Sequence, residues 1–136
     1  MTTYLSFTQV VKIHHRMIQE IEAEWQWCLH PGIYENRLSG CLERPQVVIG
    51  GYEPYPDVFS KAAALLECII SLNVFIDGSK RTGFLACELF LELNGYYINP
   101  DAEIVEFLLA VAGDDLTLSE ISHWLKRHSL KVSRVK

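Results

Sequence analysis

The stretch that decides the fold is LNVFIDGSKRTGF, residues 72–84. It sets polar and basic residues between two apolar segments, so one helix is predicted to end near Leu72–Asn73 and another to begin near Lys80. Gly78 lets the turn between them direct several backbone N–H groups into one concavity. Because a helix start is also the positive end of the helix dipole, these amides together with Lys80 and Arg81 favour a phosphate-binding site.

Two further residues of the turn fit this interpretation. Asp77 could hold Mg²⁺, a cation that carboxylate and phosphate oxygens bind together, and Phe75 would anchor the turn in the core. The turn is not a Walker A loop, because G-x-x-x-x-G-K-[ST] is absent. The same residues also suit an ordinary helix–helix turn, with Ser79 as N-cap and both cations in solvent, and the local pattern leaves both interpretations open.

The segments on either side of the turn are predicted core helices. Asp57 can cap the first, in which the run AAALLECIISL (62–72) is apolar nearly all round and therefore predicts a central, buried helix. The second runs from Lys80 to Leu93 and stops at Asn94–Gly95, a left-handed end signal.

Further helices are predicted towards both ends of the chain. A capping box at Ser6–Gln9 opens a helix to about Glu24, and another at Thr117–Glu120 opens one to about His128. Asn99–Pro100 reads as a cap and first-turn proline before a stripe that ends at Gly113. The remaining segments are predicted as loop (31–40), a short helix or extended segment (41–48), a flexible loop (44–55), and two strand candidates (47–49 and 96–98).

These patterns predict an all-α fold of about six helices, with the candidate anion-binding loop between two core helices. The length of 136 residues, without repeats or a low-complexity linker, predicts a single domain over 1–136. Its core would span about 7–128, and residues 129–136 would form a basic tail.

Charge and hydropathy limit the partners. The net charge of −5 disfavours nonspecific nucleic-acid binding, although KRHSLKVSRVK (126–136) is locally basic and reads as a solvated tail or as a contact to an acidic partner. No stretch is apolar enough to span a membrane, and the N-terminal residues lack a signal-peptide pattern. A soluble, cytoplasmic protein is expected.

The cysteines and histidines predict no metal site. Cys28, Cys41, Cys68 and Cys87 match no zinc spacing and are expected to be reduced, with Cys68 and Cys87 on apolar helical faces. The histidines form no H-E-x-x-H motif; His14 is predicted to face the core.

The motif NVFIDGSKRTGFLACELFLELNGY (73–96) resembles the signature of the Fic/Doc superfamily, on its Doc (death-on-curing) toxin branch. The family pattern is H-x-F-x-[D/N]-[A/G]-N-K-R-T, followed by an apolar helix and N-G-[Y/V]. The resemblance runs from about Phe7 to His128, and further segments that carry it are VVKIHHRMI (10–18), LERPQ (42–46), YPDVFSKAAALLECI (55–69) and DAEIVEFLLAVAGDDLTLSEISHWL (101–125).

The resemblance implies a compact helical bundle with the anion-binding loop at its centre. It also implies a toxin of a toxin–antitoxin pair that transfers part of a nucleoside triphosphate to a protein hydroxyl. Fic enzymes that transfer AMP carry the motif G-N-G-R-x-x-R, and this chain has Phe84 at the position of its second arginine. Lys80 follows Ser79, as a lysine follows the asparagine in Doc toxins. Both features resemble the Doc toxins, which are thought to phosphorylate elongation factor Tu with ATP. By position, Asp77 would hold Mg²⁺, and Gly78, Ser79, Lys80 and Arg81 would bind phosphates, with Lys80 and Arg81 in the catalytic set.

The resemblance also implies partners. The segment Arg44–Tyr52 would be the flap that aligns the target, in a strand-like pairing. A disordered C-terminal segment of the cognate antitoxin would fold onto the toxin, and nucleic acid would be contacted only through that antitoxin.

Two positions depart from the family pattern. Asn73 stands where the family has its catalytic histidine, and Ser79 stands where it has asparagine. An amide cannot take a proton at useful pH, and losing a general base costs about 10²–10⁴-fold in rate. Phosphoryl transfer depends mainly on positioning, so the anion site is expected to persist while the chemistry weakens.

Three functions therefore remain open. The first is an impaired protein-hydroxyl kinase that uses Mg²⁺ and ATP. The second is a catalytically silent protein that binds an antitoxin, and the complex of the two regulates its own operon. The third is an AMP-transferring enzyme, which Phe84 disfavours.

Overall fold

The fold is helical, as the sequence predicts. The computed structural model describes residues 1–25, 32–76 and 78–132, and within them it has six α-helices and a small two-stranded sheet. None of the helices in these ranges has the length and apolar character to cross a membrane. The elements are α1 (Phe7–Trp25), α2 (Glu35–Glu43), the 3₁₀ turn η1 (Arg44–Gln46), α3 (Val58–Ser71), α4 (Ser79–Leu93), β1 (Tyr96–Ile98), α5 (Ile104–Ala112), α6 (Leu118–Arg127) and β2 (Ser129–Lys131).

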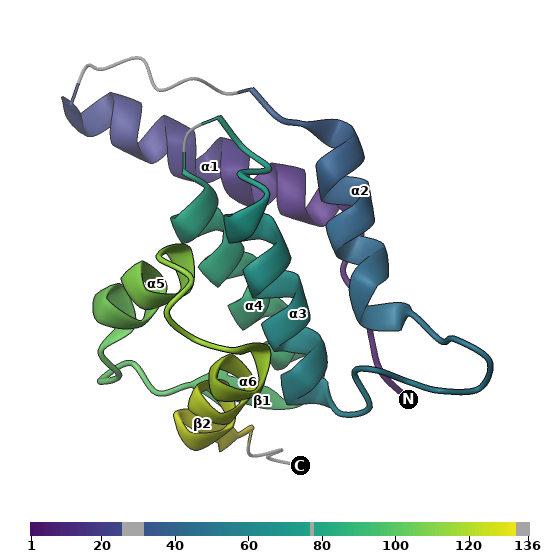
Figure 1. The fold of residues 1–136 in the computed structure, drawn as a ribbon. Coiled ribbons are helices and arrows are strands. Elements are labelled where there is room, and N and C mark those ends of the chain that lie inside the picture. Colours follow the sequence, from purple (N-terminus) through teal and green to yellow (C-terminus); the bar gives the residue numbers. More distant parts are fainter. Residues whose placement is uncertain (26–31, 77, 133–136) are drawn as a thin grey trace, which may run out of the picture.

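Helices α3 and α4 form the centre of the molecule, and the other helices pack around them (Figure 1). Most side chains of α3 are buried, which confirms the prediction of a central helix. Gly83 of α4 faces α3 so closely that a Cβ there would lie 3.2 Å from Ile69 Cγ2 and 3.3 Å from Ile70 Cγ1. The absence of a side chain at Gly83 therefore sets how near the two core helices approach.

Local capping chemistry fixes several helix starts where the sequence predicts them. At Ser6–Gln9 the serine hydroxyl accepts from the Gln9 amide at 3.2 Å, and the Gln9 side chain accepts from the Ser6 amide at 2.8 Å. The pair Thr117–Glu120 forms the same reciprocal box at the start of α6. Asp57 and Ser60 form a third box, which opens α3. Each satisfies helix N–H groups that have no partner within the helix.

The prediction of a loop at residues 31–40 is wrong, because α2 begins at Glu35. Leu38 and Cys41 are fully buried against the core, and Arg37 donates from Nη1 to the Leu72 carbonyl at 2.9 Å. These tertiary contacts stabilise a polar segment whose helix propensity alone is weak. The flexible loop predicted from Arg44 also begins with ordered structure, the turn η1.

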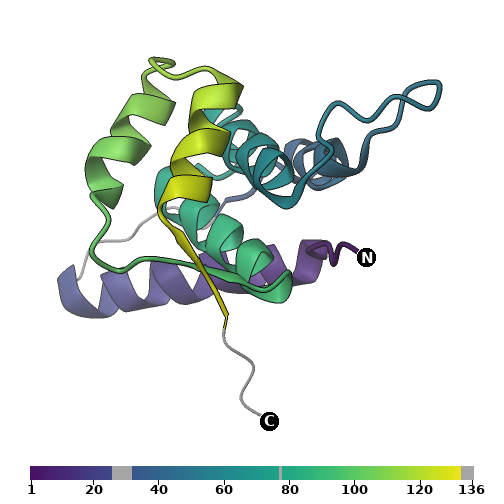
Figure 2. The ribbon, with the colours of Figure 1, turned by 90° about the horizontal axis from the view of Figure 1, so that it is seen from below.

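The segment from Val47 to Asp57 extends away from the helices (Figure 2). The strand predicted at 47–49 is not formed; instead Ile49 pairs with Tyr52 across the turn at Gly50 and Gly51, both of which have positive φ. The amide of each residue donates to the other's carbonyl, at 2.8 and 2.9 Å. The tip is therefore a minimal hairpin with exposed apolar side chains.

The C-terminal part differs from the prediction at two places. Asn99 does not cap α5, which begins at Ile104, because its side chain accepts from the Asp101 amide and closes a separate turn. The predicted strand 96–98 is confirmed as β1, and it pairs antiparallel with β2 at 129–131, within the segment predicted as a basic tail. Residues 133–136 lie outside the described residues.

Cys68, Cys87 and His14 are buried, as the sequence predicts. Cys41, Cys68 and Cys87 are buried free thiols, and Cys28 lies outside the described residues. His14 is buried at 1% exposure, as predicted.

Candidate functional site

The turn between α3 and α4 starts with a left-handed residue at Asn73. The amide of Asn73 donates to the Ile70 carbonyl, and the amide of Val74 donates to the Ile69 carbonyl, which is the Schellman arrangement of a helix end. Asn73 has φ 45°, in the region that asparagine tolerates better than most residues. Its side chain is exposed beside the turn, where a family member would present its histidine.

Phe75 anchors the turn, as the sequence predicts. Its ring is buried and stacks on that of His14, with ring centroids 4.0 Å apart. The residues before α2 run alongside this segment: the Tyr34 amide donates to the Val74 carbonyl at 2.7 Å, and Ile33 bridges Phe75. The turn is therefore held from α1 on one side and from the segment before α2 on the other.

Ser79 is buried and directed at the backbone of the turn. Its Oγ accepts from the Phe75 amide at 3.0 Å and donates to the Phe75 carbonyl at 2.9 Å. The N-cap of α4 is Gly78, so the alternative in which Ser79 caps the helix is wrong. The hydroxyl therefore closes the loop.

Gly78 holds a conformation that side chains rarely adopt. Its φ is +83°, and a Cβ there would lie 2.2 Å from the Met17 Cε of α1. As an N-cap without a side chain, it provides no side-chain acceptor for the first amides of α4. Lys80 and Arg81 follow at once and are exposed. Helix amides, the dipole and two cations thus coincide, which is the arrangement that binds anions.

A cavity of about 540 Å³ collects the residues of this turn. Of the site residues predicted from the sequence, those on its wall are Asn73, Phe75, Gly78, Ser79, Lys80 and Arg81. Ala112, at the end of α5, also contributes and was missed by sequence reasoning, since only the fold brings α5 to the turn. The volume of this cavity falls within the ~300–1,000 Å³ range of small-molecule sites.

The donor set of the wall suits polyphosphate better than a metal ion alone. Among the described residues, no three His, Cys, Asp or Glu side chains gather closely enough to hold a metal. Asp77, the predicted Mg²⁺ ligand, lies outside the described residues. A cation of this kind commonly takes one or two carboxylates together with phosphate oxygens, and the described residues of the wall include no carboxylate.

Phe84 lies at the position of the second arginine of AMP-transferring enzymes, and it is buried at 6% exposure in the core. Its side chain is part of the packing between α4 and its neighbours, and no guanidinium is supplied there.

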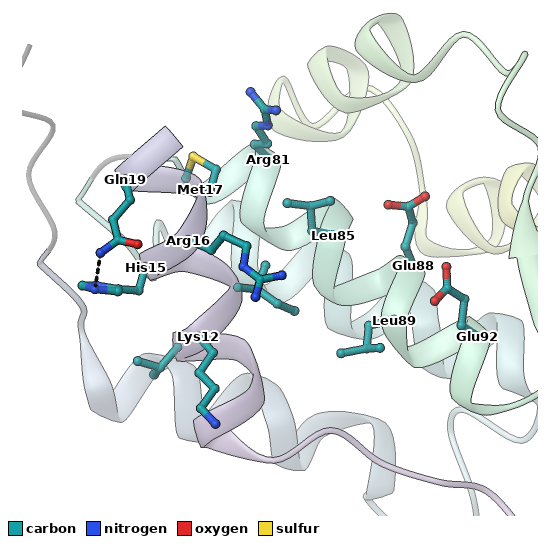
Figure 3. A pocket seen from close by; sticks show the side chains of 12 residues that line it. Lys12, His15, Arg16, Met17, Gln19, Arg81, Leu85, Glu88, Leu89 and Glu92 are labelled. Atoms are coloured by element: carbon teal, nitrogen blue, oxygen red, sulfur yellow. Dashed lines mark hydrogen bonds between the residues drawn. The ribbon is translucent and has the colours of Figure 1, made fainter. Parts of the chain in front are cut away.

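A larger groove of about 890 Å³ separates α1 from α4 and shares only Arg81 with the cavity of the turn (Figure 3). Leu85 and Leu89 point into it from α4 and form an apolar floor. Lys12 and Arg16 line it from α1, and α4 contributes Glu88 and Glu92 together with Arg81. The four-residue spacing of each pair was a signal for this groove that sequence reasoning did not use.

Electrostatics within the groove act on Glu88. Burial raises the pKa of this carboxyl, and the charge of Glu92 one turn away raises it further. Glu88 therefore favours its neutral form more than an exposed glutamate does.

The base of the hairpin at 47–52, which is part of the predicted flap Arg44–Tyr52, is fixed to α3. The buried Lys61 donates from Nζ to the carbonyls of Pro45 and Tyr55, at 3.1 and 2.6 Å. Arg44 donates to the Tyr55 hydroxyl at 2.9 Å and pairs with Glu67 at 3.0 Å. Both ends of the segment are thus held while its tip projects.

The sequence is similar to known proteins of one family. The chain is 33% identical over 88 residues to Toxin Doc of Mycolicibacterium smegmatis, a match that covers 62% of this chain and 68% of the relative. It is 27% identical over 98 residues to Protein kinase doc of Escherichia phage P1, which covers 71% of this chain and 77% of that protein. The profile of the Fic/DOC family matches residues 4–91, from before α1 into the last turn of α4 and including the whole turn between α3 and α4. The chain therefore belongs to the Fic/DOC family.

Proposed function

We propose that the chain is a Doc-type toxin whose turn between α3 and α4 binds ATP with Mg²⁺ for phosphoryl transfer to a hydroxyl of a translation factor. The observation that carries the proposal is the meeting of the α4 N-terminus, Lys80 and Arg81 on one cavity wall, beside Asn73 at the position of the family's histidine. The similarity to a protein kinase of phage P1 supports phosphoryl transfer as the reaction.

Each residue has a role in this proposal. The first amides of α4 and the side chains of Lys80 and Arg81 bind phosphate oxygens, and Asp77 holds the metal, which neutralises phosphate charge. Phe75 and Ser79 keep the turn in shape, through the ring stack on His14 and the hydrogen bonds to the loop backbone. The hairpin at 47–52 presents backbone groups to an extended segment of the target.

The proposed activity is weak in this chain. Asn73 can accept a hydrogen bond from the target hydroxyl but takes no proton, so positioning and electrostatics alone drive the transfer. Histidine is also tolerated in the left-handed region, so the backbone of Asn73, at φ 45°, accommodates the family's residue.

The test combines binding and transfer. Calorimetry of the chain with ATP and Mg²⁺ should show saturable binding, which Lys80→Ala and Arg81→Ala should each weaken at least about tenfold. Labelled ATP should then give transfer to a purified translation factor with Asn73→His at a rate about 10²–10⁴-fold above the parent. Binding without transfer in both Asn73→His and the Asn73→His/Ser79→Asn double variant would exclude the kinase.

A catalytically silent partner of an antitoxin is the second candidate, and the groove between α1 and α4 favours it. An apolar floor at Leu85 and Leu89 with charged rims suits one amphipathic helix, the form in which a disordered antitoxin segment would fold on binding. Tight antitoxin binding with no uptake of nucleotide would select this function. An AMP transferase is disfavoured, because Phe84 is buried in the core; mass spectrometry of the modified target separates the two transfers.

A further inference from the structure

Asn73, on the wall of the cavity of the turn, has a backbone conformation that its surroundings must hold. Its φ of 45° is uncommon for a residue other than glycine, and such conformations persist where neighbouring contacts fix them. Asp114, at φ 60°, is the second such residue in the described ranges, and its amide donates to a carbonyl of α5, the helix that it follows. Asn73 differs, because residues from the start of α2 also hold the backbone on both of its sides.

Arg37 of α2 holds the peptide group that precedes Asn73. The carbonyl of this group belongs to Leu72 and accepts from Arg37 Nη1 at 2.9 Å. The N–H of the same group belongs to Asn73 and donates to the Ile70 carbonyl at 3.2 Å. Both polar ends of this planar unit are therefore bonded, one to α2 and the other to α3, and the side chain of residue 73 projects from a fixed peptide.

Tyr34, the N-cap of α2, joins Arg37 to the other side of Asn73. Its amide donates to the Val74 carbonyl at 2.7 Å. The guanidinium carbon of Arg37 lies 4.1 Å from the centroid of the Tyr34 ring, a cation–π contact that also restricts the long arginine side chain. One carbonyl on each side of Asn73 is thus held by Tyr34 and Arg37, which contact each other.

The packing of α2 on the core depends on other residues. Leu38 and Cys41 are fully buried, whereas Arg37 is exposed, so its replacement opens no cavity in the core. Loss of the Arg37 contacts is therefore expected to loosen the turn at Asn73 while α2 stays in place.

We infer that Arg37, supported by the ring of Tyr34, is a positioning residue for position 73. It acts through the backbone and fixes the direction in which the side chain at position 73 meets the hydroxyl of the target. The inference rests on the proposed function in one respect, that position 73 acts on this hydroxyl. Group transfer is sensitive to small displacements of the reacting groups, so the loss of Arg37 should lower the rate of transfer more than the binding of ATP.

The first experiment measures amide hydrogen exchange by NMR in the full chain and needs no activity. Arg37→Met removes the donor and keeps an unbranched side chain, and the Asn73 amide should exchange about three- to tenfold faster than in the parent. The Leu38 amide, which donates to the Tyr34 carbonyl at 3.0 Å, should keep its rate because α2 remains packed. Arg127→Met, at an exposed arginine of α6, is the matched control and should change neither rate.

Two results of this experiment would overturn the inference. An unchanged rate at Asn73 in Arg37→Met would show that the guanidinium does not hold the turn. An equal increase at Asn73 and Leu38 would show that Arg37 holds the whole of α2 and has no separate effect on position 73.

Tyr34→Leu tests the support that the ring gives to Arg37, because it keeps the backbone amide and removes the cation–π contact. The Asn73 amide should exchange faster than in the parent, by less than in Arg37→Met. Exchange at the parent rate would overturn the part assigned to the ring.

The second experiment measures transfer from labelled ATP to a purified translation factor in the Asn73→His background. Adding Arg37→Met should lower kcat about tenfold and leave the KM for ATP unchanged. Arg37→Lys, which keeps a donor for the Leu72 carbonyl, should recover part of kcat, and Arg127→Met should have no effect. A rise in KM with kcat unchanged, or an equal fall in kcat with Arg127→Met, would overturn the inference. Absence of transfer in Asn73→His itself would count against the proposed function, and the exchange rates would then decide the role of Arg37.

Discussion

The hydroxyl of Ser79 joins the start of α4 to the backbone of Phe75, with Oγ 3.0 Å from the amide nitrogen and 2.9 Å from the carbonyl oxygen. Ser79→Ala would leave both backbone groups without this partner in a buried setting. The expected loss of unfolding free energy is about 1–3 kcal/mol, measured by urea denaturation. Ser129→Ala is the matched control, since the buried Ser129 Oγ has no hydrogen-bond partner among the described residues and its removal should cost much less. Equal losses would contradict the structural role of Ser79.

Any side chain in place of Gly78, at the N-cap of α4, is expected to lower the stability of the folded chain. Gly78→Ala forces an alanine into the left-handed backbone region, which costs about 1–2 kcal/mol. Its β-carbon would also collide with Met17, so displacement of the Met17 side chain adds a second cost. Gly95 has φ +95° with nothing within 4 Å of a Cβ, so Gly95→Ala measures the backbone strain alone. Thermal unfolding should show a larger decrease in Tm for Gly78→Ala than for Gly95→Ala. An equal or smaller decrease for Gly78→Ala would mean that the contact with Met17 carries no cost.

The contacts of the buried Lys61 predict that this side chain keeps the flap in place. Lys61→Met keeps the length of the side chain but removes the donor to the Pro45 and Tyr55 carbonyls, which should cost about 2–3 kcal/mol. The segment between those carbonyls should open more often, and chymotrypsin should cleave at the exposed Tyr52 faster than in the parent. Lys126→Met, at an exposed position of α6, should leave both stability and the cleavage rate unchanged.

Glu88 predicts a dependence of stability on pH. Because burial and Glu92 raise the pKa of Glu88, the folded chain holds this proton at pH values where the unfolded chain releases it. The contribution of Glu88 to unfolding free energy is therefore present below the ordinary pKa of 4.5 and decreases as pH rises towards the folded pKa. Glu88→Gln should remove this decrease and be more stable than the parent at pH 7, in urea titrations from pH 4 to 7. Glu53→Gln, at an exposed loop carboxylate, is the matched control for the loss of one carboxyl group.

The parts of the fold that depend on neighbouring residues could be predicted from the sequence. The capping boxes at Ser6–Gln9 and Thr117–Glu120 are satisfied within four residues, so their patterns state the helix starts directly. The apolar run of α3 similarly required a buried helix. Phe75, Gly78 and the two cations were identified from the turn itself, and they line one cavity.

The parts that depend on distant residues could not. Helix α2 forms because Leu38 and Cys41 meet the core, and its own polar sequence, with Gly40, gives little sign of it. The strand β2 requires β1 as a partner, and no pattern in Ser129–Lys131 predicts that pairing. The direction of the Ser79 hydroxyl, towards Phe75 rather than the helix end, follows from the shape of the loop and not from the residue type.

The pairing of β1 with β2 also sets an order of assembly. Three residue pairs, from Tyr96 with Lys131 to Ile98 with Ser129, close a loop that contains both α5 and α6. On a translating ribosome α1 to α4 emerge before this loop can close, since its second strand is made only after α6. A nascent chain stalled between the two strands therefore leaves β1 with an unpaired edge, open to a chaperone or to the β2 of another chain.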